Sequence, residues 1–468
     1  MSRFTRREGE KTVNLMQANV DELVSPIPDG QAKPLNILYI CNTPNERDST
    51  TANAIFDYLD AFSIYSTNNI FVLSNTGRLP SWVDLAQYDA VVIHWSIYLL
   101  GEDYIASSSL EALAAFRGLK ILFIQDEYRT IRAFWDVIRR VKFDVIFTCM
   151  PPHLVDVVYP PSELPHVRKV SILTGYVPSA LCHVKVPSID ERTVDVFYRG
   201  RQLPYWLGRV AQEKHWVASE FERKTEGKAL TLDLKTAEAE RIYGDEWLRR
   251  LMNCRATIGV ESAASILDFD GSIQKSVEAF MRKNPEATFE ECERTCFPGL
   301  DGKWNTAQIS PRIFEAIALR TPLILLEGSY SGLLEPGRHY IPLRKDFSNI
   351  DEVVKALKDD AYLRNISLAA FHEVALNPTL GYPHFISRFD KVIEEEIERR
   401  GATRSVLPIK PAAFSALIEA HRARRKRVAA RNRAIFAMLN HLPVRFILQW
   451  MPTSLKKRLR SMVRGLVQ

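Results

Sequence analysis

Long apolar runs are absent from this chain. None of its 468 residues belongs to a run of about 18 consecutive apolar residues, so no membrane-spanning helix is predicted. The first residues are polar and basic, without the apolar segment of a signal peptide behind them, so we expect no secretion signal. No G-x-G-x-x-G or Walker A sequence follows an apolar run, which disfavours a dinucleotide oxidoreductase and a P-loop enzyme.

Cysteine is also scarce, with six in the whole chain. Cys292 and Cys296 form an isolated C-x3-C pair without a nearby histidine, and the other four are far apart. This spacing favours ordinary reduced thiols over a zinc site. Reduced thiols make a reducing cytoplasm the simplest compartment.

The length and composition predict a globular protein of more than one domain. Hydrophobic residues make up 46% and charged residues 25% of the chain, as is usual for globular proteins. Changes in composition suggest five parts. We expect a flexible segment at 1–33, a first domain at 34–180, a linker at 181–193, a second domain at 194–400 and a basic tail at 401–468.

Short apolar runs that do not alternate with polar residues indicate strands buried on both faces, as in parallel sheets. In the first domain they lie at 35–41, 90–95, 120–125 and 144–149, with helical segments at 49–62, 107–116 and 130–141. In the second they lie at 194–200, 256–261 and 322–327, with helical segments at 244–254, 310–320, 349–360 and 383–400. The pattern predicts an α/β fold of two Rossmann-like domains that face a cleft, with the site at the carboxyl ends of the strands.

The stretch "SPRIFEAIALRTPLILLE" from Ser310 to Glu327 holds the strongest local signal. Ser310 is a good helix N-cap and Pro311 suits the first helical position. Free N–H groups at such a helix start attract anions, and Arg312 adds a forked donor for phosphate oxygens. Glu315, one turn further, could accept hydrogen bonds from neighbouring hydroxyls. Alternatively, both charged residues lie on the solvated face of an amphipathic helix.

The sequence from this helix to Leu357 resembles the donor-binding half of GT-B glycosyltransferases, closest to the group 1 and spore-maturation-like branches. The resemblance rests on F-E-A in the helix, an apolar strand, a Gly/Ser loop and "HYIPL". It covers 194–400 well and the first half in outline. It implies transfer of a sugar from a nucleoside diphosphate donor, with Glu315 at the ribose and the Ser310 helix at the diphosphate. The group 1 pattern has a further glutamate where Ala307 stands here.

The same resemblance implies basic residues after the first strand of the second domain, where they would neutralise the leaving diphosphate. Arg199 and Arg201 match this role best and Lys214 less well, although all three could be surface charges. Guanidinium and helix N–H groups can replace a metal ion, so no metal or other cofactor is expected. Glu261 and Ser262, at the end of the 256–261 strand, are candidate donor contacts.

Asp268 and Asp270 form a D-x-D sequence, which is the metal signature of a different glycosyltransferase architecture. In that architecture it follows a strand of an N-terminal nucleotide domain, whereas here it lies in the second domain. We therefore favour a loop or sugar-contacting role over metal binding.

Candidate catalytic residues follow strands of the first domain. His94 ends the 90–95 run, Asp126 and Glu127 follow the 120–125 run, and Asp48 follows the first strand. An inverting transferase needs a general base for the acceptor hydroxyl, whereas a retaining one can use a donor phosphate oxygen. His94 could instead be a hydrogen-bonded core residue, and Asp126 could cap the next helix.

The basic tail contrasts with an acidic body. Residues 401–468 hold 15 of the 62 basic residues and one of the 56 acids, a net charge of +14, which leaves −8 for the rest. A helical apolar stripe is expected at Leu455, Leu459, Met462, Val463 and Leu466. These features predict an anchor on anionic lipid, with RNA binding or a docking helix as alternatives.

The combined expectation is an enzyme at the cytoplasmic membrane face that glycosylates a glycan or lipid-linked acceptor and does not bind nucleic acid. Two alternatives stay open. A nucleotide-sugar epimerase of the same fold would turn over donor without an acceptor, and a nucleotide-sugar sensor would bind donor without turnover.

Overall fold

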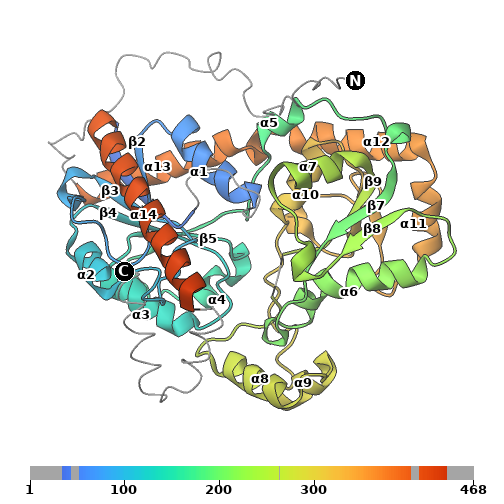
Figure 1. Cartoon of the computed structure of the whole chain (residues 1–468), viewed down its shortest axis with the longest axis horizontal. Helices are drawn as coiled ribbons and strands as arrows, with labels where there is room; N and C mark the ends of the chain where they lie inside the picture. The colour runs from blue at the N-terminus through green and yellow to red at the C-terminus, as the bar shows by residue number, and fades with distance from the viewer. Residues whose placement is uncertain (1–33, 44–51, 263, 402–410, 440–468) are drawn as a thin grey trace, which may run out of the picture.

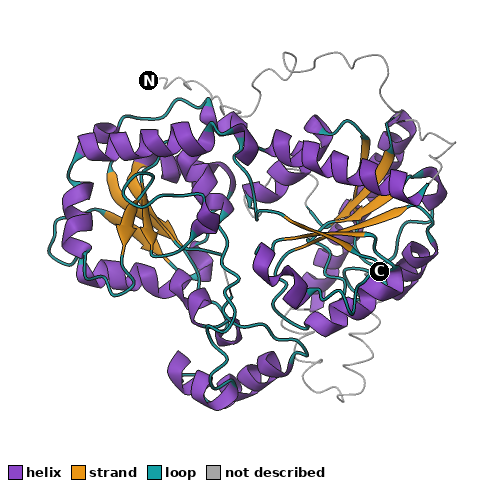
Figure 2. Ribbon diagram, turned by 180° about the vertical axis from the view of Figure 1, so that it is seen from behind, coloured by secondary structure: helices purple, strands orange, loops and turns teal. Residues whose placement is uncertain are grey.

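The computed structural model describes residues 34–43, 52–262, 264–401 and 411–439, and it contains two α/β domains (Figure 1). Each domain has a central parallel sheet with helices on both faces (Figure 2). The predicted α/β architecture of two Rossmann-like domains, as in the GT-B arrangement, is confirmed. Asp48 and the stripe from Leu455 to Leu466 lie outside the described residues.

The sheet of the first domain has six strands in the order β2-β1-β3-β4-β5-β6. The four predicted runs form its centre, and every residue of β1, β3, β4 and β5 is buried, which explains why these runs do not alternate. The two outer strands are only partly buried and gave no such signal. The strands are β1 (Asn36–Cys41), β2 (Asn69–Ser74), β3 (Ala90–Ile93), β4 (Leu119–Ile124), β5 (Val145–Thr148) and β6 (Arg168–Ser171).

Helices cover both faces of this sheet. One face packs against α1 and α13, and the other packs against α2, α3, α4 and α14, with a separate apolar core on each side. Their bounds are α1 (Asn53–Tyr65), α2 (Ser107–Ala115), α3 (Ile131–Val141), α4 (Val155–Val158), α13 (Tyr382–Arg400) and α14 (Pro411–Leu439).

The second domain repeats this strand order with five strands, β11-β10-β9-β7-β8. Helices α5, α7 and α10 contribute to the core on one face, and α6, α11 and α12 to the core on the other. The strands are β7 (Val194–Arg199), β8 (Leu232–Lys235), β9 (Cys254–Gly259), β10 (Leu323–Leu326) and β11 (Ile341–Leu343). The helices are α5 (Ser179–Cys182), α6 (Arg209–Lys224), α7 (Gly244–Asn253), α8 (Ser272–Lys283), α9 (Phe289–Cys296), α10 (Pro311–Ala318), α11 (Ile350–Leu357) and α12 (Asp360–Ala370).

Helix α13 follows the second domain in sequence but packs on the first. Its apolar side chains join the core beneath α1, and Asp390 accepts hydrogen bonds from Ser66, Thr67 and Asn68 at the end of α1. The chain therefore crosses between the domains twice. The two crossings meet in a backbone bridge, where the Val177 N–H donates to the Leu380 carbonyl.

Helices α8 and α9 form a small lobe below the second domain (Figure 1). The segment that leads into this lobe pairs with the chain that follows β4 of the first domain. The Asp268 N–H donates to the Tyr128 carbonyl at 2.8 Å, and the Arg132 N–H donates to the Phe269 carbonyl at 2.9 Å. Leu267 is buried in the core of the first domain. These contacts join the domains beside the carboxyl end of β4.

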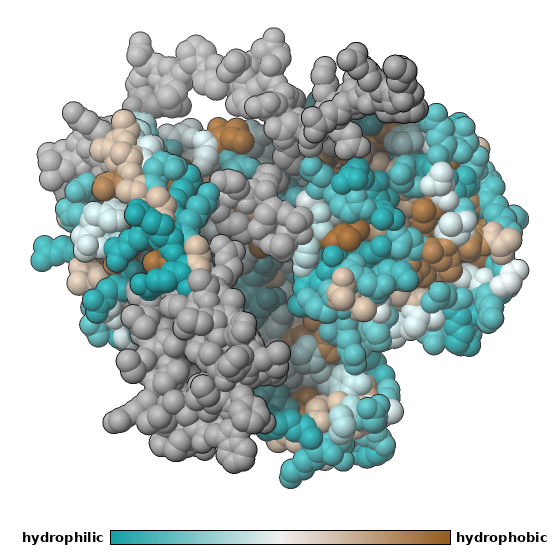
Figure 3. Space-filling view, viewed as in Figure 1, coloured by the Kyte–Doolittle hydropathy of each residue, from teal (hydrophilic) through white to brown (hydrophobic). Residues whose placement is uncertain are grey.

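Part of the basic tail belongs to the folded body. Phe414 and Ile418 of α14 are buried, and the Phe414 ring lies 5.0 Å from Phe71 and 6.1 Å from Trp82. On the face of the molecule drawn in Figure 3, hydrophilic residues cover most of the described surface of both domains, and hydrophobic residues form smaller patches. Among the described helices, none has the length and apolar character needed to cross a bilayer.

Candidate functional site

Strand order identifies one end of each sheet as a binding position. In both parallel sheets the order of the strands reverses between the first and third strands of the domain, which are β1 and β3 in the first domain and β7 and β9 in the second. Ligands of open α/β sheets bind outside the carboxyl ends of the strands at such a switch point. In the second domain Arg199 ends β7, and Glu261 and Ser262 follow β9 closely.

A cavity of about 250 Å³ lies at this switch point. Five of its lining residues are basic and none is acidic. One part is apolar and reaches the sheet beneath α7. The lining residues are Tyr198, Arg199, Gly200, Arg201, Lys214, Arg241, Ile242, Trp247, Leu251, Thr257, Ile258, Gly259, Val260, Ser262, Ser310, Arg312, Ile313 and Leu323. This composition suits an anionic ligand with an apolar portion.

Two of the five cations are neutralised by neighbouring acids. Arg199 pairs with Asp233 at 2.8 Å, and Arg241 pairs with Glu238 at 2.6 Å. The other three, Arg201, Lys214 and Arg312, have no carboxylate partner in the described part of the chain. Three positive charges without a direct ion pair therefore face the cavity, and the charges of Glu315 and Asp126 act on Arg312 and Lys214 from beyond ion-pair distance.

The position of Lys214 depends on close packing of α6 against the end of β7. The Tyr198 hydroxyl donates to the Lys214 carbonyl at 2.9 Å, and a Cβ on Gly200 would lie 2.1 Å from that carbonyl oxygen. Only glycine allows this approach. Burial, with help from the positive charge of Arg312, lowers the pKa of Lys214 to about 8, and Asp126 opposes that change.

Helix α10 brings its N-terminus and an arginine to the same cavity. Ser310 is the N-cap residue, as predicted, but its side chain makes no capping hydrogen bond. Arg312 donates to the Arg199 carbonyl at 2.7 Å, and its guanidinium lies 4.8 Å from the Trp247 ring centre. The Ser262 hydroxyl lies 3.4 Å from the Lys214 ammonium nitrogen. Serine hydroxyls and cations thus line one side of the cavity together.

Glu315 lies behind this wall. Its side chain is buried, with 4% of the residue exposed, and its Oε2 accepts a hydrogen bond from Trp247 Nε1 at 2.7 Å. Glu315 is not among the residues that line the cavity, whereas Trp247 is. In this structure Glu315 influences the cavity through the tryptophan that it holds and through its charge, which acts on Arg312.

Glu261 does not line the cavity and instead holds the loop that follows β10. Its Oε1 accepts hydrogen bonds from the Ser329 hydroxyl at 3.1 Å and from the Tyr330 N–H at 2.7 Å. A Cβ on Gly328 would lie 2.5 Å from Oε2, so a side chain at this position would displace the Glu261 carboxylate. Glu261 therefore fixes the loop after β10, and its neighbour Ser262 lines the cavity.

His94 is a core residue of the first domain. It has no exposed surface, its Nδ1 accepts from the Ser96 N–H at 3.2 Å, and its ring lies 3.8 Å from that of Trp95. Burial lowers the pKa of His94 to about 3. The imidazole is neutral at ordinary pH and lacks the access to solvent that a general base for an incoming hydroxyl requires.

Glu127 is enclosed as well, with 3% of the residue exposed. Its carboxylate accepts from the Thr148 hydroxyl at 2.5 Å, from the Cys149 N–H at 2.8 Å and from the Tyr159 hydroxyl. Burial raises the pKa of Glu127 to about 7, although these hydrogen bonds act against the rise. The side chain ties the end of β4 to the end of β5.

Asp126 is exposed, whereas the adjacent Glu127 is buried. The backbone of Asp126 is left-handed with a φ of 59°, and its Oδ1 accepts from the Tyr128 hydroxyl at 2.7 Å. Among non-glycine residues, Asp and Asn tolerate this backbone best. Burial lowers the pKa of Lys214 and the charge of Asp126 offsets part of this change, so the carboxylate lies near the cavity of the second domain. Of the three predicted catalytic residues, it is the one exposed beside the cations.

The D-x-D pair has a structural role in α8. Asp268 accepts from the Gly271 and Gln274 N–H groups, both at 2.9 Å, and Asp270 accepts from the Ser272 N–H at 2.9 Å. These carboxylates hold the start of the helix. Among the described residues, no three His, Cys, Asp or Glu side chains gather in a way that suits a metal ion.

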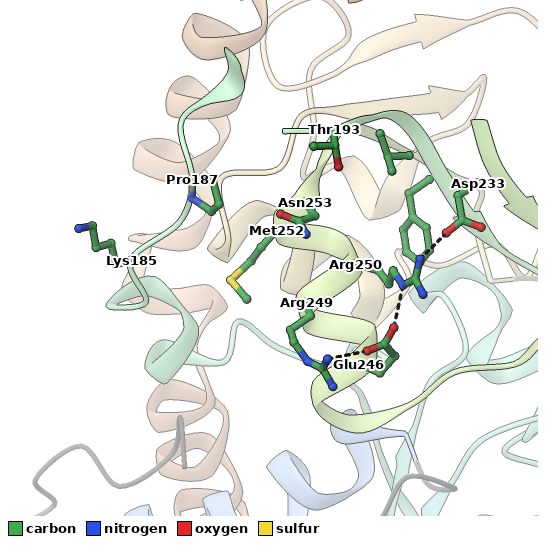
Figure 4. Close-up of a pocket in the computed structure, with 11 residues that line it drawn as sticks. Lys185, Pro187, Thr193, Asp233, Glu246, Arg249, Arg250, Met252 and Asn253 are labelled. Atoms are coloured by element: carbon green, nitrogen blue, oxygen red, sulfur yellow. Dashed lines mark hydrogen bonds and ion pairs between the residues drawn. The ribbon is translucent and has the colours of Figure 1, made fainter. Parts of the chain in front are cut away.

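A larger cavity of about 480 Å³ lies near the start of β7 and the end of α7 (Figure 4). Its charges neutralise one another. Arg250 pairs with Asp233 at 3.4 Å and with Glu246 at 2.7 Å, and Arg249 pairs with Glu246 at 2.9 Å. It is away from the carboxyl ends of the strands, and Lys185 is its one lining cation without an ion pair among the described residues, so it is the weaker candidate.

Four further residues at or beside the small cavity were not identified from the sequence. Trp247 and Arg241 lie in or just before α7, in a segment that reads as an ordinary amphipathic helix. Tyr128 and Arg129 follow β4 directly, so the rule that sites lie at strand carboxyl ends could have found them. No local sequence pattern indicates that Trp247 or Arg241 belongs to a site.

The fold and the cavity thus define a two-domain α/β protein with a cationic pocket at the switch point of its second sheet. No protein-family model matches the chain, and no curated protein matches it. Solved structures match at low identity. T4 phage BGT with its UDP-glucose substrate has 11% identity and a TM-score of 0.46, over 77% of this chain and 99% of that one. An α1,3-fucosyltransferase has 10% identity and a TM-score of 0.40, over 79% and 93%.

Proposed function

We propose that this protein is a glycosyltransferase that uses a nucleoside diphosphate sugar. The observation that carries the proposal is the group of three cations without a direct ion pair, Arg201, Lys214 and Arg312, around a cavity that the α10 N-terminus also lines. A diphosphate is the ligand that best matches forked donors, an ammonium group and a helix start. The family resemblance of the sequence from Ser310 to Leu357 supports the same donor.

The apolar part of the cavity would hold the nucleoside. Trp247, Ile242 and Leu251 supply its surface, and the rigid Trp247 ring can contact a base or a ribose. Glu315 contributes to this subsite by fixing the Trp247 indole. Glu315 itself does not line the cavity, so its proposed contribution to the nucleoside subsite is made through Trp247.

In the proposed reaction, the Asp126 carboxylate takes the proton of the acceptor hydroxyl. At the same time the hydroxyl oxygen bonds to the anomeric carbon of the donor sugar. The bond from that carbon to the phosphate oxygen breaks, and the nucleoside diphosphate leaves with the electron pair. Arg201, Lys214 and Arg312 stabilise the charge that develops on the leaving group. A base on the acceptor side suits inversion at the anomeric carbon.

The proposed chemistry needs no metal ion. The cations and the α10 N–H groups take the place of a divalent metal at the diphosphate. The carboxylates of Asp268 and Asp270 are occupied by N–H groups of α8, which supports this arrangement.

The proposed acceptor is a glycan or a lipid-linked glycan at the cytoplasmic face of a membrane. The support is the charge of residues 401–468, which is +14. Helix α14 buries Phe414 and Ile418, while Arg424, Lys426 and Arg427 are exposed. Exposed cations on a docked helix can attract anionic lipid headgroups.

Turnover of a panel of nucleotide sugars, with release of the nucleoside diphosphate as the readout, tests the proposal. At least one donor should be consumed, faster in the presence of an acceptor extract. Asp126→Asn should lower kcat by about 100-fold or more because the base is lost, with little change in donor affinity. The control Asp103→Asn changes an exposed aspartate elsewhere in the first domain. No turnover of any donor, or full activity of Asp126→Asn, would contradict the proposal.

A further inference from the structure

Arg129 is a cation with an unusual position between the two domains. Its guanidinium carbon lies 5.0 Å from the Tyr98 ring centre in the first domain and 5.9 Å from the Trp206 ring centre in the second. Its side chain makes no hydrogen bond or ion pair to any other residue that the structure describes. The aromatic rings stabilise the charge, yet they leave the in-plane N–H donors of the guanidinium unused.

These donors point to a ligand near the proposed base. Asp126, Tyr128 and Arg129 follow one another closely after β4, and the Tyr128 hydroxyl donates to Asp126. Burial raises the pKa of Tyr128 and Asp126 adds to the rise, whereas Arg129 and Arg201 act in the opposite direction, so all three charges lie around that hydroxyl. An acceptor hydroxyl beside Asp126 would bring its neighbouring groups within reach of Arg129.

Position separates this arginine from the donor site. Arg201, Lys214 and Arg312 line the proposed diphosphate cavity. Arg129 does not line that cavity. It lies on the acceptor side without an ion-pair partner among the described residues, with the fork geometry that suits a phosphate.

We propose that Arg129, fixed between Tyr98 and Trp206, forms a phosphate subsite for the acceptor. The inference rests on the proposed function and deepens it: the acceptor carries a phosphate group close to the hydroxyl that receives the sugar. A lipid-carrier headgroup and a phosphate within a glycan both have this chemistry. Arg129 is a binding and specificity residue and takes no part in the transfer of the proton.

The test measures phosphate binding separately from donor binding. Full-length protein saturated with a nucleoside diphosphate is titrated calorimetrically with inorganic phosphate and with decyl phosphate. Arg129→Gln should weaken both phosphate affinities by about tenfold or more, because charge-assisted hydrogen bonds are lost, and should leave nucleoside diphosphate affinity within about twofold. Arg129→Lys keeps the charge without the fork and should be intermediate. The control Arg132→Gln removes an exposed arginine three residues further along and should change neither.

Each outcome of these titrations either supports or overturns the phosphate subsite at Arg129. Tighter binding of decyl phosphate than of inorganic phosphate supports a lipid-linked acceptor, and equal binding supports a glycan phosphate. Equal phosphate binding by wild type and a folded Arg129→Gln would overturn the subsite. A parallel loss of nucleoside diphosphate binding would overturn it too, since it would assign Arg129 to the donor. If wild type binds no nucleotide, the proposed function fails, while the phosphate titration without nucleotide still decides the subsite.

Discussion

The lowered pKa of Lys214 predicts that donor affinity falls in mildly alkaline solution. The ammonium is charged below its pKa of about 8 and loses its charge as the pH rises through that value. The protonated fraction is about 0.76 at pH 7.5 and about 0.09 at pH 9. If only the charged form binds the diphosphate, affinity falls by about eightfold over this interval, since the phosphates themselves are fully ionised throughout.

Calorimetric titration of a nucleoside diphosphate at constant ionic strength, in half-unit steps from pH 7.5 to pH 9, measures this effect. Lys214→Arg carries a permanent charge and should bind with nearly constant affinity across the range. Lys214→Met should bind about 10- to 100-fold more weakly at pH 7.5 and should also lack the pH dependence. A parallel loss of affinity in wild type and Lys214→Arg would refute the reasoning, because the titrating group would then lie elsewhere.

Three further predictions follow from the geometry. Glu315→Ala should lower the free energy of unfolding by about 1–3 kcal/mol in a denaturant titration, because it leaves the buried Trp247 N–H without its acceptor. Glu315→Gln should lower it by less, and equal stability of wild type and both variants would contradict this prediction. EDTA should leave turnover unchanged, whereas loss of activity that a divalent ion restores would reassign the site to Asp268 and Asp270. Arg424→Glu with Arg427→Glu should reduce sedimentation with anionic liposomes, and wild-type binding should weaken at high salt; unchanged sedimentation of the double variant would speak against α14 as the contact.

The central part of the fold could be predicted from the sequence because its signal is local. Strands β1, β3, β4 and β5 are buried on both faces, so their apolar runs stand out. The outer strands β2, β6 and β8 are partly exposed and carry mixed residues. The packing of α13 on the first domain was out of reach, because position along the chain does not reveal which of two cores a helix joins.

The sequence indicated the region of the candidate site better than the position of each side chain in it. Strand ends and the Ser-Pro helix start pointed to Arg199, Arg201 and Arg312, and these three residues line one cavity. Side-chain direction was the missing information. Asp126 and Glu127 are adjacent in sequence, yet the left-handed backbone at Asp126 leaves its side chain exposed while Glu127 is buried.

The most direct measurement of the central claim is calorimetric titration of nucleoside diphosphates, without sugar, against wild type and the double variant Arg201→Gln, Arg312→Gln. The matched control is Arg249→Gln, which alters a paired arginine at the larger cavity. We predict that wild type and the control bind at least one nucleoside diphosphate with equal affinity, and that the double variant binds it at least 100-fold more weakly while it remains folded. Equal affinity of the double variant and wild type, or no binding of any nucleoside diphosphate by wild type, would contradict the assignment of this cavity as the donor site.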